Sequence, residues 1–185
     1  MPLPAKAFYI IRHGESVANL GRYASGHVDV PLTDKGWEQA RAAADIVKSL
    51  DIKPTVVIHS HLQRARNTAH VLNEVLNAPI FEHPEIAEQC YGDWEGQPWD
   101  ITRQPTRDGI DPPNGESHAD FYERVKNAVT NFVNSHEGPV LIVCHGGVFR
   151  ALGALYGEKI HGVENCALHY FEPVEHDIFP WSIRK

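Results

Sequence analysis

Short apolar runs alternate with longer amphipathic stretches along most of this 185-residue chain. The runs at 8–11, 55–58 and 140–144 are rich in β-branched residues and predict buried strands, and shorter runs at 79–81 and 167–171 predict two more. Apolar side chains recur at three- and four-residue intervals over 34–50, 62–77, 118–133 and 148–156, which predicts helices. Thr33 and Ser117 stand where N-caps are expected.

Strands that alternate with helices indicate an α/β fold. We therefore expect a three-layer α/β/α arrangement around a mostly parallel central sheet, in a single domain over 1–185. The segment from about 84 to 114 interrupts the pattern, because it carries Pro98, Pro105, Pro112 and Pro113. An irregular segment of this length is more often a functional lid than a passive connection, so we expect it to cover a site.

Three polar residues follow predicted strands directly, namely His13, Ser60 and His145. The carboxyl ends of parallel strands form the ligand-binding edge of such sheets, so all three are expected at one rim. Arg12 offers a fork of donors for phosphate oxygens, and a neutral imidazole such as that of His13 can attack phosphorus. A basic pair exposed at the end of a strand is the alternative for these two residues.

Two further positions at this rim suit an anionic ligand. Arg64 falls in the first turn of a predicted helix, where the helix dipole favours anions, although a solvated helix arginine is the simpler interpretation. Gly146 follows His145 and lets a ligand approach the backbone, while a purely structural role for His145 stays open.

The overall composition and charge exclude some classes of partner. A net charge of −7 argues against nucleic acid, and no apolar run reaches the length of a membrane span or a secretory leader. The three cysteines lack a paired spacing and indicate reduced thiols, so we expect a cytoplasmic protein of unknown oligomeric state. Twelve histidines raise the question of a metal, but His59 and His61 have no evident third ligand, and we expect neither metal nor cofactor.

Taken in order, the motifs of this chain resemble those of the histidine phosphatase superfamily, in the phosphoglycerate mutase-like branch 1. The resemblance covers nearly the whole chain. It rests on Arg12-His13-Gly14-Glu15-Ser16 with Asn19, Ser60 with Leu62 and Arg64, Glu88 with Gly92-Asp93-Trp94-Glu95-Gly96, Gly115-Glu116-Ser117, and His145-Gly146-Gly147. His61 and Cys144 depart from the family pattern, and Cys144 is expected to be the neighbour of the site most sensitive to oxidation.

The resemblance implies a role for each matching residue. His13 is implied to be the phosphohistidine nucleophile, and Glu88 the general acid that later activates water. Arg12, Arg64 and a protonated His145 are implied to bind the transferred phosphoryl group, and Asn19 to contact phosphate. The implied activity is that of a histidine acid phosphatase-type phosphoric monoester hydrolase, acting on a small phosphorylated substrate without a metal.

Two other functions compete with the phosphatase. The mutases of this family carry a longer insertion with extra arginines for a substrate carboxylate. Here Arg103, Arg107 and Arg124 are the only arginines between Glu88 and His145, and no two are adjacent, which favours hydrolysis. A catalytically silent module that binds a phospho-ligand or a protein is the third possibility.

Overall fold

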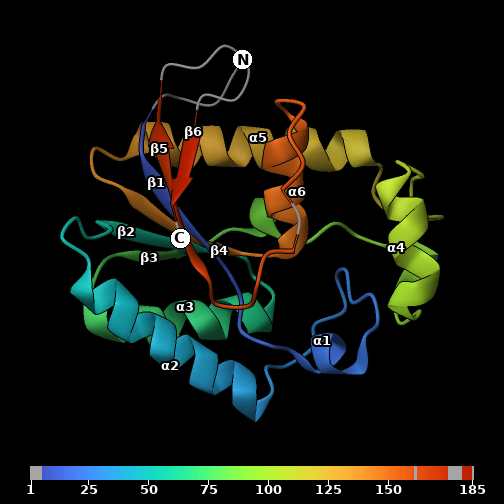
Figure 1. The fold of residues 1–185 in the computed structure, drawn as a ribbon, viewed down its shortest axis with the longest axis horizontal. Coiled ribbons are helices and arrows are strands. Elements are labelled where there is room, and N and C mark those ends of the chain that lie inside the picture. The colour runs from blue at the N-terminus through green and yellow to red at the C-terminus, as the bar shows by residue number, and fades with distance from the viewer. Residues whose placement is uncertain (1–5, 161, 175–180, 185) are drawn as a thin grey trace.

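A computed structural model describes residues 6–160, 162–174 and 181–184. Six strands form one sheet in the order β3-β2-β4-β1-β5-β6 (Figure 1). The strands β1 to β4 are mutually parallel, whereas β5 and β6 run antiparallel at one edge. The mostly parallel sheet is therefore confirmed. The strands are β1 (Phe8–Arg12), β2 (Val56–His59), β3 (Ile80–Glu82), β4 (Val140–Cys144), β5 (Leu168–Pro173) and β6 (Trp181–Arg184).

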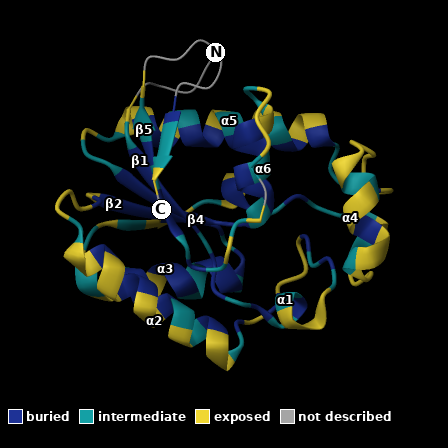
Figure 2. Cartoon of the chain, in the orientation of Figure 1, coloured by how far each residue is buried: buried dark blue, intermediate teal, exposed yellow. Residues whose placement is uncertain are grey.

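Helices cover both faces of this sheet. The helices α2 (Asp34–Ser49) and α3 (Gln63–Leu76) pack against one face, and α5 (His118–Ser135) and α6 (Gly146–Ala154) against the other (Figure 1). Along β1, Phe8 and Ile10 join the α5–α6 core, whereas Tyr9 and Ile11 join the α2–α3 core. Successive side chains of a strand point to opposite faces, so a continuous apolar run supplies both cores. The three-layer α/β/α fold is confirmed, and Figure 2 shows its buried centre.

The helix starts follow the local signals in the sequence. Thr33 accepts a hydrogen bond from the Gly36 backbone N–H at the start of α2, and Ser117 accepts one from the Asp120 N–H at the start of α5. Each cap satisfies a donor that the helix itself leaves unpaired. Both predicted N-caps are confirmed.

The segment 84–114 is more regular than its proline content suggests. It holds two short 3₁₀ helices, Pro84–Ile86 and Gly92–Trp94, and the α-helix α4 (Trp99–Arg107). Pro105 lies inside α4, where it removes one intrahelical hydrogen bond, and this explains why the sequence did not predict a helix there. The short helix α1 (Val17–Gly21) and strand β6 were also not predicted.

Backbone hydrogen bonds fasten the start of α4 to the segment that follows α1. The N–H of Trp99 donates to the Arg22 carbonyl at 2.9 Å, and the N–H of Ala24 donates to the Gln97 carbonyl at 2.9 Å. As a result α4 and α1 lie on the same side of the molecule, to the right of the sheet in Figure 1. Among the described residues, no helix is both long and apolar enough to cross a membrane.

Candidate active site

His13 follows β1 at the edge of the sheet, and its ring is held in one orientation. Its Nδ1 lies 2.7 Å from the carbonyl oxygen of Gly14. A carbonyl only accepts hydrogen bonds, so Nδ1 carries the proton and Nε2 keeps its lone pair. Burial first, and then Arg64 and Arg12, hold the pKa of His13 well below its usual value of 6.5. At neutral pH the ring is therefore uncharged and nucleophilic.

The turn after β1 packs too tightly for a side chain at Gly14. A Cβ at this position would lie 2.4 Å from the Gly36 carbonyl oxygen of α2. The Gly14 N–H donates to Thr68 Oγ1 on α3 at 3.1 Å. These contacts tie the loop that carries His13 to both helices of that layer.

Asn19 both caps α1 and lines the cleft in front of His13. Its Oδ1 accepts from the Ser16 N–H at 3.1 Å and from Asn165 Nδ2 at 3.1 Å. Asn165 Nδ2 also donates to the His13 carbonyl oxygen at 2.7 Å. The Asn19 amide nitrogen has no partner among the described residues, so it is the part of Asn19 available to an anion.

Two largely buried arginines lie beside His13. Arg64 is 1% exposed and donates to the carbonyl oxygens of Gly26, at 2.8 Å, and Val28, at 3.0 Å. Arg12 donates to the Val163 carbonyl at 2.8 Å, and its buried Nε has no partner in the described part of the chain. Burial lowers the pKa of both groups, yet guanidinium stays charged in proteins. Two cations held only by carbonyls make a site for an anion.

His145 lies directly after β4, with its ring centroid 5.1 Å from that of His13. It is completely buried and does not line the open cleft. Neither ring nitrogen has a partner among the described residues. Burial, followed by Arg64, His13 and Arg12, holds its pKa well below 6.5. The residues of the site therefore favour a neutral His145 and not the expected protonated form, because a cation there would be buried among other cations.

Glu88 lines the same cleft, and both of its carboxylate oxygens accept backbone N–H groups. Its Oε2 accepts from Gly147 at 3.0 Å and its Oε1 from Gln89 at 3.0 Å. A Cβ on Gly147 would lie 1.8 Å from Glu88 Oε1, so only glycine leaves room for the carboxylate. Gly146 lines the cleft beside Arg12.

The cleft has a volume of about 310 Å³ and holds six of the seven predicted site residues in its lining, the exception being His145. Ser60, expected at the same rim, does not line it. Its hydroxyl accepts the Leu62 N–H at 3.2 Å and shapes the turn into α3, which places Arg64. Ser60 is therefore a structural residue.

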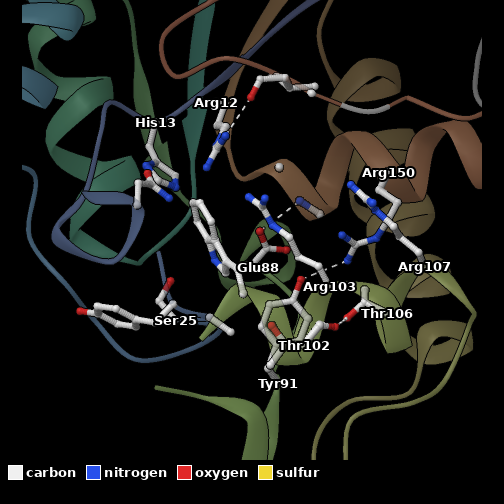
Figure 3. Close-up of a pocket in the computed structure, with 18 of the residues that line it drawn as sticks. Arg12, His13, Ser25, Glu88, Tyr91, Thr102, Arg103, Thr106, Arg107 and Arg150 are labelled. Atoms are coloured by element: carbon white, nitrogen blue, oxygen red, sulfur yellow. Dashed lines mark hydrogen bonds between the residues drawn. The ribbon is translucent and has the colours of Figure 1, made fainter. Parts of the chain in front are cut away.

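A second wall of the cleft was not predicted. Arg103 and Arg107 of α4 both line it, together with Arg150 of α6. Figure 3 shows Glu88 in the middle of the cleft, with His13 on one side and these three arginines on the other. The sequence has no adjacent arginines between Glu88 and His145, and on sequence alone this favours hydrolysis over mutase activity. That criterion was misleading, because residues four apart, such as Arg103 and Arg107, share a helix face. That spacing was the signal available in the sequence, and it required α4 to be recognised as a helix.

Arg150 is held in the wall by polar neighbours. It donates to Gln89 Oε1 at 3.1 Å and to the Tyr91 hydroxyl at 3.2 Å. Burial alone would lower the pKa of Arg150, but Tyr91 and Glu88 raise it overall. Arg150 therefore stays positively charged. Its buried Nε has no partner among the described residues and is available to a ligand.

Comparison with known proteins agrees with this geometry. Residues 8–175 match the family model of the histidine phosphatase superfamily (branch 1). The chain is 35% identical over 147 residues to the uncharacterized phosphatase PhoE of Bacillus subtilis (strain 168), which covers 79% of this chain and 75% of that protein. It is 34% identical over 194 residues to the probable phosphoglycerate mutase GpmB of Serratia proteamaculans (strain 568), with 94% and 86% covered.

A solved structure shows the same fold. The mycobacterial glucosyl-3-phosphoglycerate phosphatase in complex with VO3 superimposes with a TM-score of 0.80 at 26% identity, with 97% of each chain covered. The chain belongs to the histidine phosphatase superfamily.

Proposed function

We propose that this member of the histidine phosphatase superfamily hydrolyses small phosphate monoesters through a phosphohistidine at His13, without a metal ion. The observation that carries the proposal is the hydrogen bond from His13 Nδ1 to the Gly14 carbonyl. It directs the lone pair of Nε2 to the reaction and stabilises the positive charge that the ring gains when Nε2 is phosphorylated.

In the first step, His13 Nε2 attacks phosphorus and the bond to the ester oxygen breaks. Glu88 gives its proton to that oxygen, so the alcohol leaves neutral and Glu88 becomes a carboxylate. Arg12 and Arg64 bind the non-bridging oxygens, whose charge must be stabilised in the transition state. The amide nitrogen of Asn19 and the backbone at Gly146 complete this phosphate site.

In the second step, Glu88 takes a proton from water and the water oxygen attacks phosphorus. The P–N bond breaks, inorganic phosphate leaves, and both His13 and Glu88 return to their starting states. His145 takes part through its unpaired ring nitrogens. A phosphate dianion would offset the cations around His145 and favour its protonated form.

We further propose that the alcohol part of the substrate carries negative charge. Arg103, Arg107 and Arg150 lie in the wall across from His13, where the leaving group of a bound ester would extend. Burial first, and then the neighbouring cations Arg22 and Arg107, lower the pKa of Arg103. A phosphorylated acid or a second phosphate suits such a wall, and the same arginines keep a mutase-type transfer as the second candidate function.

We also propose that the protein is cytoplasmic, because free thiols are typical of proteins in that compartment. Cys90, Cys144 and Cys166 are all free. Burial raises the pKa of Cys144 well above its usual value and that of Cys166 to about 12, so both stay protonated. The expectation that Cys144 is sensitive to oxidation is accordingly reversed, because a buried neutral thiol is a poor nucleophile.

The nucleophile is tested by trapping the intermediate. We expect a labelled aryl phosphate to give an acid-labile phosphoenzyme in the unaltered protein and none in His13→Ala, with turnover lost in parallel. His59→Ala is the matched control, since His59 Nδ1 makes the same type of bond to the Ser60 carbonyl, at 2.9 Å, outside the cleft. A phosphoenzyme in His13→Ala would refute the assignment, and loss of turnover with a chelator would refute the metal-free mechanism.

A further inference from the structure

The segment that carries Glu88 is fastened by an ion pair outside the cleft. Arg124 of α5 and Glu116 form a two-point contact, with Arg124 Nε to Glu116 Oε1 at 2.7 Å and Nη2 to Oε2 at 2.7 Å. Both side chains are largely buried, at 21% and 17% exposed. A bidentate ion pair of this kind fixes both the distance and the relative orientation of the two side chains.

The remaining donors of Arg124 reach the backbone just before and at Glu88. Nη1 donates to the carbonyl oxygens of Glu85, at 2.7 Å, and Ala87, at 3.3 Å, while Nη2 donates to that of Glu88 at 3.4 Å. The guanidinium thus uses all five of its N–H groups, and three of them hold residues 85–88.

Glu116 holds the backbone that follows Glu88. Its backbone N–H donates to the Cys90 carbonyl at 2.9 Å, and its Oε2 accepts from the Cys90 N–H at 3.4 Å. Its carbonyl oxygen accepts from Gln89 Nε2 at 2.9 Å. Gly115 permits this close approach, because a Cβ there would lie 2.6 Å from the Cys90 carbonyl oxygen.

We infer that Arg124 and Glu116 are positioning residues that set the place of the general acid and base Glu88. The inference rests on the proposed function and gives a role to the Gly115-Glu116-Ser117 motif, which the cleft itself does not explain. Ser117 caps α5, and Arg124 lies two turns further along that helix, so one short segment delivers both partners. A misplacement of about 1 Å at a catalytic group can cost ~100-fold in rate.

The test compares two aryl phosphates that differ only in a para nitro group. Departure of 4-nitrophenolate needs little proton donation, whereas phenol has a pKa of about 10, like tyrosine, and leaves poorly as an anion. We expect Arg124→Lys, which keeps the charge but loses the fork, to lower kcat/KM about tenfold for phenyl phosphate and less than twofold for 4-nitrophenyl phosphate.

Glu88→Gln separates this inference from the proposed function. It should lower kcat/KM for phenyl phosphate about a hundredfold, and Arg124→Lys should add nothing in the Glu88→Gln background. If Glu88→Gln affects both esters equally, Glu88 is not the general acid and the proposed function is wrong at that point. If it discriminates but Arg124→Lys slows both esters alike, or the two losses multiply, the positioning inference is wrong.

Two further variants keep the outcome interpretable. Glu116→Gln preserves the shape of the partner and should repeat the leaving-group pattern, which decides the question if Arg124→Lys does not fold. Arg184→Lys is the matched control, because Arg184 pairs with Glu172 on β5, away from the Glu88 segment. It should change neither ester.

Discussion

The two walls of the cleft differ in how firmly their cations are held. On the sheet side, His13, Arg64 and His145 are at most 4% exposed. On the helix side, Arg103 and Arg107 are exposed residues of α4, whereas Arg150 of α6 is held by Gln89 and Tyr91. Buried groups keep one geometry, as a reaction at phosphorus requires, whereas exposed arginines can adapt to different partners. The difference suggests that the sheet wall performs the chemistry and the helix wall selects the substrate.

The electrostatics of the two walls differ in the same sense. Arg12 and Arg64 make no ion pair with any residue that the structure describes: their hydrogen bonds go to carbonyl oxygens, and the charge of Glu88 acts on both without direct contact. A buried charge with no direct ion-pair partner is costly, and an anionic ligand offsets that cost. On the helix wall, Arg103 stacks on the Trp99 ring at 3.8 Å and stays in contact with water. Binding of an anion to Arg103 should therefore stabilise the protein less than binding of an anion to Arg12 and Arg64.

The largest expected effect comes from removing a buried cation of the sheet wall. Arg64→Ala should lower kcat by about a hundred- to a thousandfold for every phosphate ester, which corresponds to roughly 3–4 kcal/mol of lost transition-state stabilisation. Steady-state kinetics on phenyl phosphate measures the loss. Arg66→Ala is the matched control on the same helix, because its side chain is 42% exposed and pairs with Glu82. A nearly unchanged kcat in Arg64→Ala would place Arg64 outside the chemistry.

The sheet wall was predictable from sequence because its geometry follows from topology. His13, Arg64 and His145 each stand just after a buried strand or in the next helical turn. Strands β1, β2 and β4 are adjacent and parallel, so their carboxyl ends meet. An apolar run followed by a polar residue was sufficient to bring these side chains together.

The helix wall was not predictable in this way. Pro105 obscured α4, and Arg150 lies in α6 with no local signal that it reaches the cleft. The protonation state of His145 was also out of reach, because it depends on burial among Arg64, His13 and Arg12, which come from separate parts of the chain. Properties that depend on packing between distant segments were the ones that the sequence did not reveal.

An intermediate effect is expected on stability in acid. The folded-state pKa values of His13 and His145 are lowered, so below about 6.5 the unfolded chain takes up protons that the folded chain does not. The free energy of unfolding should therefore fall as pH decreases from 6.5, by about 1.4 kcal/mol per pH unit for each histidine. Urea unfolding at several pH values between 7.5 and 5 measures this slope.

His145→Gln should reduce that slope by about one proton, because it removes one group that the unfolded chain protonates and the folded chain does not. Inorganic phosphate should also reduce the slope, since an anion in the cleft favours the protonated ring. An unaltered slope in His145→Gln would mean that the ring is already protonated in the folded protein, and the contrast in electrostatics between the walls would be lost.

The smallest expected effect is the one that assigns substrate selection to the helix wall. Arg103→Ala and Arg107→Ala should each raise KM about fivefold for 4-carboxyphenyl phosphate, because an exposed ion pair is worth up to ~1 kcal/mol. Phenyl phosphate, which lacks the carboxylate, should keep its KM, and kcat should stay the same for both esters. Arg66→Ala serves again as the control. If KM rises equally for the two esters, α4 contacts the phosphoryl group itself, and recognition and chemistry do not divide between the two walls.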